Sequence, residues 1–142
     1  MRILITNLIL TDRTGTEIVT MELAAGLRRR GHEVAIYSPH IGKTAKDVQR
    51  EGIIVLDTLS ELPWDPDVIH GHHNIVVAAA LMRFPRTPAL LVSHHPEHWV
   101  EGPLPVSGIK RALAVSEACR DRFVKEGGLR ADKIDLLLNA VD

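Results

Sequence analysis

Short aliphatic runs alternate along the chain with segments in which apolar residues recur at helical spacing. Turn-forming residues bound most of the runs, and several are apolar at successive positions, as strands buried on both faces of a parallel sheet are. The expected strands are residues 3–9, 33–37, 53–56, 67–69, 89–92, 112–115 and 134–138. The expected helices are residues 17–30, 45–51, 75–82 and 117–126. This alternation predicts one Rossmann-like, doubly wound α/β domain, with a mostly parallel sheet of about six or seven strands and helices on both faces.

Residues that start or end helices support two of these boundaries. The arginine run 28–30 falls in the last turn of the first expected helix, where positive charge suits the helix dipole. Gly31 follows it and can adopt the left-handed conformation that ends a helix. Ser116 is expected to be the N-cap of the helix that follows it. The segment 96–108 holds three prolines and two glycines and is expected to be a loop.

Composition narrows the class of protein. A chain of 142 residues fits one ordinary domain, and its apolar share of 45% and charged share of 25% are typical of globular proteins. The net charge of −1, with only two Phe, two Trp and one Tyr, argues against a nucleic-acid-binding protein. Cys119 is the only cysteine, so no intrachain disulfide can form. The apolar start lacks the cleavage site of a signal peptide, so we expect a cytoplasmic protein, with peripheral contact at the inner face of the membrane as the weaker alternative.

Polar residues gather where the expected strands end. In an open parallel sheet, ligands bind beyond the carboxyl ends of the strands, where loops and helix N-termini meet. The segments at such ends are residues 11–17, 70–74, 94–98 and 116–117. We therefore expect these four segments to share one rim of the sheet and to contain the functional site.

The first of these segments has the features of an anion-binding turn. Thr14, Gly15 and Thr16 come just before a helix, so backbone N–H groups and the helix dipole would face an anion such as a diphosphate. The alternative is that Gly15 only allows the chain to turn. The segment is neither a GxGxxG fingerprint nor a P-loop, which removes the main support for a dehydrogenase or a P-loop NTPase.

Six of the eight histidines lie in two clusters at this rim. They are His70, His72, His73, His94, His95 and His98. Histidine can orient hydroxyl groups, transfer protons near neutral pH or ligate a metal, and a spacing of two in a strand puts His70 and His72 on one face. The plainer alternative is that some of these side chains are only polar groups hydrogen-bonded at strand ends. In the same way, Ser116 is an N-cap first and a ligand contact second.

Several short motifs follow one another in a fixed order. They are Gly15-Thr16-Glu17, Arg30-Gly31-His32-Glu33-Val34, Pro66 to His72, Pro88 to His94, Ala114-Val115-Ser116-Glu117 and Asn139-Ala140-Val141-Asp142. In this order and spacing they resemble the N-terminal domain of the retaining GT-B glycosyltransferases of the group 1, or family 4-like, type. The resemblance covers nearly all of the chain. Thr14 and Ala140 stand where that family usually has glycine, and the segment 96–108 is compact where the family often has a longer insertion.

The resemblance implies half of a GT-B fold. Residues 1–138 would be the acceptor-side domain, and residues 139–142 would begin the crossover to a C-terminal domain that binds the nucleotide-sugar donor. No cofactor is then expected in this domain, and the chain alone is expected to be inactive. The partner domain would lie in the same or a separate chain, and we favour an excised domain. The acceptor stays open between a small molecule, a glycan and a lipid-linked molecule.

The resemblance also implies roles for individual residues. The loop at Thr14, Gly15 and Thr16 would approach the donor diphosphate. His94 would be the catalytic histidine that lies against the transferred sugar, and His95 is its alternative because the register at a strand end is uncertain by a residue. The residues that would face the acceptor or line the rim are Glu17, His70, His72, His98, Ser116 and Glu117. No metal site is implied.

Two other functions stay open at this point. A metal-dependent hydrolase could be built on His70, His72, His94 and His95, provided that further ligands complete the set at the same rim. A Rossmann-like module could also recognise a carbohydrate or a partner protein without catalysis. Metal content and transfer activity distinguish these classes from a glycosyltransferase.

Overall fold

Parallel pairing organises the strands of the chain into one large sheet. The computed structural model describes residues 1–138, and the expected crossover at residues 139–142 lies outside them. The sheet has the order β5-β3-β1-β6-β7-β8-β9, with all neighbours parallel. Its strands are β1 (Arg2–Thr6), β3 (Glu33–Tyr37), β5 (Ile54–Leu56), β6 (Val68–His72), β7 (Ala89–Ser93), β8 (Ile109–Ala114) and β9 (Ile134–Leu136). The seven strands confirm the predicted Rossmann-like sheet.

The strand order reverses direction beside β1. The chain first builds outward from β1 through β3 to β5, then crosses back to start β6 on the other side of β1. Neighbouring loops leave a crevice at the carboxyl ends of the strands at such a topological switch point. The predicted rim therefore has its centre between the ends of β1 and β6.

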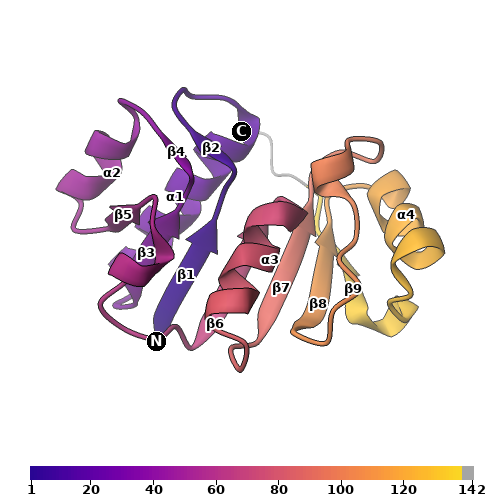
Figure 1. The fold of residues 1–142 in the computed structure, drawn as a ribbon. Coiled ribbons are helices and arrows are strands. Elements are labelled where there is room, and N and C mark those ends of the chain that lie inside the picture. Colours follow the sequence, from indigo (N-terminus) through magenta and orange to yellow (C-terminus); the bar gives the residue numbers. More distant parts are fainter. Residues whose placement is uncertain (139–142) are drawn as a thin grey trace.

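Four helices cover the two faces of this sheet. α1 (Gly15–Arg29) and α2 (Ala45–Arg50) bury Ala24, Ala25, Ala45 and Val48 against one face. α3 (Asn74–Arg83) and α4 (Glu117–Gly127) pack on the opposite face, and in Figure 1 α3 crosses in front of β6 and β7. The prediction of helices on both faces is thus confirmed. None of the described helices is long and apolar enough to cross a membrane.

The first predicted strand, residues 3–9, is wrong at its end. β1 stops at Thr6, and β2 (Ile9–Leu10) is a separate strand that pairs with β4 (His40–Ile41) in a small second sheet. The break occurs because Asn7 turns its amide onto α1, where Nδ2 donates to Thr16 O at 3.1 Å and to Thr20 Oγ1 at 2.8 Å. A polar residue buried between two aliphatic stretches therefore ends the main strand.

Other element ends differ from the sequence prediction by a few residues. The first helix begins at Gly15 rather than Glu17. β6 continues to His72, so His70 and His72 both belong to the strand. β8 begins at Ile109, since it pairs with β7 from Ala89 onward, and β9 ends at Leu136 rather than at 138. Within the expected loop 96–108, a short 3-10 turn forms at η2 (Trp99–Glu101). Gly31 has the predicted positive φ, at 86°.

Close packing between β6 and α3 depends on Gly71. A Cβ atom added there would overlap the Val77 side chain of α3 and approach the Leu90 carbonyl oxygen of β7 to 3.0 Å. Gly26 in α1 is a contrasting glycine, because only the end of the Arg29 side chain, at 3.9 Å, lies near its Cβ position. One glycine is therefore a packing requirement and the other is not.

We predict opposite effects of alanine at these two glycines. Gly71→Ala forces α3 away from the sheet, and we expect it to lower the free energy of unfolding by about 1–3 kcal/mol. Gly26→Ala reduces the flexibility of a helix interior, and we expect a gain of up to about 1 kcal/mol. Urea unfolding of both variants measures the difference. Equal stability of the two variants would contradict the packing role of Gly71.

Candidate functional site

A hollow of about 300 Å³ lies at the switch point between β1 and β6. Thr14, Thr16 and Glu17 line it from the first loop and the start of α1, while His73 and His98 line it from the loops after β6 and β7. Segments that are distant in sequence thus converge at one rim, as the strand ends predicted. We call this cavity the switch-point hollow.

The Glu17 side chain shapes the loop that borders the hollow. Its carboxylate accepts hydrogen bonds from the N–H groups of Thr11 at 2.7 Å, Asp12 at 2.9 Å and Thr14 at 3.1 Å, and from the Thr14 hydroxyl at 2.6 Å. Burial raises the pKa of Glu17, but these hydrogen bonds outweigh it and hold the pKa below its ordinary value. Glu17 therefore lies at the predicted rim, but its buried carboxylate accepts four hydrogen bonds and supports the loop.

The start of α1 stays open beside this support. The Glu17 carboxylate takes no hydrogen bond from the Gly15 or Thr16 N–H groups, which lie in the first turn of a fifteen-residue helix. Gly15 is exposed, and a Cβ atom added there would meet no atom within 4 Å. Its φ is not in the left-handed region, so the turn itself does not require glycine.

His73 links the end of β6 to the first loop. Among residues 1–138 it is the one non-glycine residue with positive φ, at 64°, and its ring is buried. Its Nδ1 accepts the Leu8 N–H at 3.1 Å, so the ring proton resides on Nε2, which lies 3.2 Å from Glu101 Oε1. His73 is therefore a structural histidine whose tautomer is fixed by its two partners.

Glu101 is a residue that sequence reasoning missed. It is only 5% exposed, and besides His73 it binds the backbone N–H of His94 through Oε2 at 2.8 Å. Burial raises the pKa of Glu101, but the hydrogen bonds from His73 and His94 lower it by more. The pKa of Glu101 therefore lies below its ordinary value. Glu97, the carboxylate that the sequence offered in this loop, is exposed instead. The loop sequence has no regular pattern of apolar and polar residues that would tell a buried Glu101 from an exposed Glu97.

His70, His72 and His94 form a row of rings on one face of the sheet. The ring centroids of His70 and His72 lie 5.0 Å apart, as do those of His72 and His94. His72 Nδ1 and His94 Nε2 are 2.8 Å apart, which is a hydrogen bond. The predicted same-face arrangement of His70 and His72 is confirmed, and His94 of the next strand end joins it.

Burial keeps this row uncharged. It lowers the pKa of His70 to about 4, and the nearby His94 adds to the effect. The pKa of His72 is lowered well below its ordinary value by burial and by the surrounding histidines. Burial also lowers the pKa of His94, although Glu101 opposes the shift. At neutral pH the His94 side chain therefore acts by hydrogen bonding and not as a cation.

The other candidate residues lie outside this row. His95 is exposed, and its Nδ1 accepts the N–H groups of Glu97 at 3.1 Å and His98 at 3.2 Å, so it stabilises its own loop. Ser116 is the predicted N-cap of α4, because its hydroxyl accepts the Cys119 N–H at 3.2 Å. Glu117 is exposed and pairs with Arg120 at 3.6 Å. Neither Ser116 nor Glu117 lines the switch-point hollow.

The row of histidines does not form a metal-binding set. Within residues 1–138, no three His, Cys, Asp or Glu side chains are arranged to hold a metal ion. Two ring nitrogens of the row are instead hydrogen-bonded to each other, at His72 and His94. The geometry thus gives the metal-dependent hydrolase no complete ligand set.

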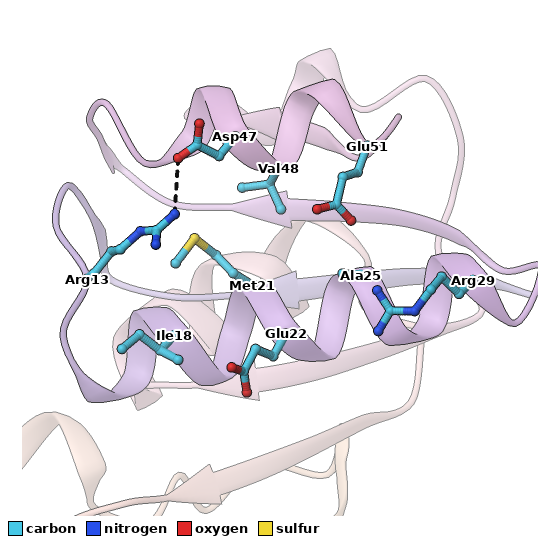
Figure 2. Close-up of a pocket in the computed structure, with 9 residues that line it drawn as sticks. All are labelled: Arg13, Ile18, Met21, Glu22, Ala25, Arg29, Asp47, Val48 and Glu51. Atoms are coloured by element: carbon cyan, nitrogen blue, oxygen red, sulfur yellow. Dashed lines mark hydrogen bonds and ion pairs between the residues drawn. The ribbon is translucent and has the colours of Figure 1, made fainter. Parts of the chain in front are cut away.

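A larger hollow of about 740 Å³ lies away from these residues, between α1 and α2. Figure 2 shows Met21 and Val48 facing into it, with Arg13 reaching Asp47 across one end at 3.3 Å. Its walls are helix surfaces, and none of the histidines at the strand ends contributes to them. We therefore place the site at the switch-point hollow, where the strand ends meet.

We predict that the buried histidines make stability fall in mild acid. The unfolded chain takes up protons on them below pH about 6.5, whereas the folded chain resists protonation, so stability is lost as the pH falls from 6.5 toward 4. For His70 alone the loss is about 3 kcal/mol by pH 4. His70→Leu should flatten this dependence in urea unfolding. An unaltered pH dependence in His70→Leu would refute the assignment.

Two solved structures share the fold of this chain. A glycosyltransferase from Rickettsia africae superimposes with a TM-score of 0.70 at 17% identity, covering 99% of this chain and 43% of that one. Anabaena HepE, solved in complex with UDP and glucose, superimposes with a TM-score of 0.69 at 21% identity, covering 99% of this chain and 45% of that one. The chain thus spans less than half the length of both, and it forms one half of a GT-B fold.

Sequence comparison identifies the family directly. No curated protein matches the chain at a significant level. The sequence profile described as Glycosyltransferase Family 4, however, matches residues 13–142, which is nearly the whole chain. The motifs that carried the resemblance lie within this range. The chain therefore belongs to Glycosyltransferase Family 4.

Proposed function

We propose that the chain is the acceptor-side half of a retaining glycosyltransferase that takes a sugar from a nucleotide-sugar donor. One observation carries the proposal: the open start of α1 and the His94 loop meet around the switch-point hollow. His73 and Glu101 connect the two, because Leu8 N–H binds His73, His73 binds Glu101, and Glu101 binds the His94 backbone. The start of α1 and the loop that follows His94 thus line one hollow, although His94 itself is not among the lining residues.

The start of α1 supports a role in binding the donor diphosphate. The N–H groups of Gly15 and Thr16 point out of the first helical turn, where the helix dipole favours negative charge. Gly15 leaves this approach free, since a Cβ atom there would stand in open space and not against protein. Anabaena HepE was solved with UDP and glucose, and we extend a donor of that general class to this chain.

His94 supports a role at the transferred sugar. Its neutral ring can hydrogen-bond an oxygen that gains charge as the sugar–phosphate bond breaks, and such a preorganised contact lowers the barrier. In the proposed retaining reaction, the acceptor oxygen bonds to the anomeric carbon on the face that the phosphate leaves, and the acceptor proton passes to that phosphate. The protein then needs to position the reactants and requires no pair of catalytic carboxylates.

The second half of the active site would come from another domain. The chain spans 43% and 45% of the two solved structures, and we propose that a donor-binding domain, in the same or a separate chain, closes over the switch-point hollow. On this proposal the chain alone has no transferase activity. His70 and His98 would then border the acceptor side, whereas the His72 side chain, expected there from the sequence, is only 1% exposed and would not face the acceptor. A binding module without catalysis is the outcome if the complete pair transfers no sugar.

We predict that His94→Ala in the complete enzyme lowers kcat by about 100-fold, the scale of a lost transition-state hydrogen bond. His95→Ala is the matched control, because that exposed ring bonds only its own loop, and it should retain most of the activity. Steady-state kinetics with a panel of nucleotide sugars compares the two. A fully active His94→Ala enzyme would transfer the catalytic role to His95 or remove it.

We also predict that Gly15→Ala separates stability from donor binding. The added methyl group contacts no protein atom, so the free energy of unfolding should stay the same or rise slightly. The methyl group would occupy the path of the diphosphate, and we expect KM for the nucleotide sugar to rise about tenfold. Unfolding and kinetics of the same variant give both values. An unchanged KM would place the diphosphate elsewhere.

A further inference from the structure

The His72 ring contacts the His94 ring, and the proposal above gives it no chemical role in the reaction. Its side chain is 1% exposed, and its ring is held at the end of β6 beside the end of β7. The ring makes one hydrogen bond, from Nδ1 to His94 Nε2 at 2.8 Å. Its other nitrogen, Nε2, is buried and has no hydrogen-bond partner among residues 1–138. The contact with His94 is therefore the single hydrogen bond of the His72 side chain among residues 1–138.

One proton lies between the two rings, and there are two ways to place it. Both rings are uncharged near neutral pH, so each carries one N–H and one lone pair. Either His72 Nδ1 donates to His94 Nε2, or His94 Nε2 donates to His72 Nδ1. The first arrangement leaves the His94 proton on Nδ1, and the second leaves the His72 proton on Nε2.

The orphaned nitrogen decides between these arrangements. A proton on His72 Nε2 would bury an N–H donor with no acceptor, and such donors are rare in folded proteins. A proton on His72 Nδ1 instead satisfies the donor and leaves only a lone pair without a partner. His94 Nε2 is then the acceptor, and the His94 proton resides on Nδ1. That nitrogen bonds no residue of 1–138 and is not among the buried orphan atoms.

We infer that His72 is a positioning residue, which fixes His94 as the Nδ1–H tautomer and thereby makes it a hydrogen-bond donor to a substrate oxygen. The tautomer follows from the two rings alone, whereas the role of the substrate oxygen rests on the proposed glycosyl transfer. The Glu101 carboxylate holds the backbone of His94, and His72 orients its ring, so the two act on different parts of one residue. His94 thus reaches the substrate with its proton already placed.

Nitrogen NMR of the ¹⁵N-labelled 142-residue chain tests the tautomer without any activity measurement. Correlations between ring nitrogens and ring protons identify the protonated nitrogen of His94. We expect Nδ1–H in the wild-type chain near pH 7. A spectrum with the proton on Nε2, or with both nitrogens protonated, overturns the inference.

Variants at His72 test whether that residue sets the tautomer. His72→Asn retains a short side chain that can donate from the Nδ1 position, and it should keep His94 as Nδ1–H. His72→Leu has a similar size and no donor, and we expect His94 to shift mostly to Nε2–H. His70→Leu is the matched control, since the His70 ring contacts His72 without a hydrogen bond to His94, and it should leave the His94 tautomer unchanged. An unchanged His94 tautomer in a folded His72→Leu chain contradicts the role.

Kinetics of the complete enzyme separates this inference from the proposed function. His72→Leu should lower kcat about tenfold with KM nearly unchanged, the scale seen when the partner of a functional histidine is lost, and His72→Asn should recover most of it. If the NMR result holds but His94→Ala remains fully active, the proposed reaction fails while the tautomer assignment stands. If His94→Ala is impaired but wild-type His94 carries its proton on Nε2, the tautomer assignment fails while the proposed role of His94 stands.

Discussion

The site depends on one buried carboxylate, that of Glu101. A buried charge is costly unless hydrogen bonds replace its hydration, and here the His73 ring and the His94 backbone N–H provide them. Both partners follow strands that only the fold brings together, so the carboxylate can be satisfied only when β6 and β7 lie side by side. The same contacts fix the loop that carries His94. A requirement for burial thus becomes a means of positioning the residue proposed for catalysis.

The sequence predicts the architecture well, because alternation of aliphatic runs and helical segments follows from burial alone. Strand 33–37 matches β3 at both ends, and Gly31 and Ser116 have the predicted cap roles. The rim is predictable for a similar reason: the carboxyl ends of parallel strands must share one edge. Even the pairing of His70 with His72 follows from the two-residue period of a strand. Local rules therefore bring the correct residues to the correct edge of the sheet.

What the sequence does not reveal is which side chains at that edge bind each other. Glu101 lies in a segment without periodicity, and only the tertiary structure separates its buried carboxylate from the exposed one of Glu97. Glu17 lies at the predicted rim, yet its carboxylate is occupied by hydrogen bonds from its own loop. The contact between His72 and His94 joins two strands and has no sequence signature. Each of these interactions is decided by hydrogen-bond satisfaction in three dimensions.

The parallel sheet has an electrostatic consequence. Because every strand ends at the same edge, α1, α3 and α4 all begin there, and their positive dipole ends point toward the same solvent. Such helix N-termini favour negative charge whatever the formal net charge, which is −1 here. Fields from helix ends decay within a turn or so and are unlike those of lysine-rich surfaces. Binding of a phosphorylated ligand would then depend on direct contact rather than on long-range electrostatic steering. Polyanions such as nucleic acids would gain little affinity from these short-range fields.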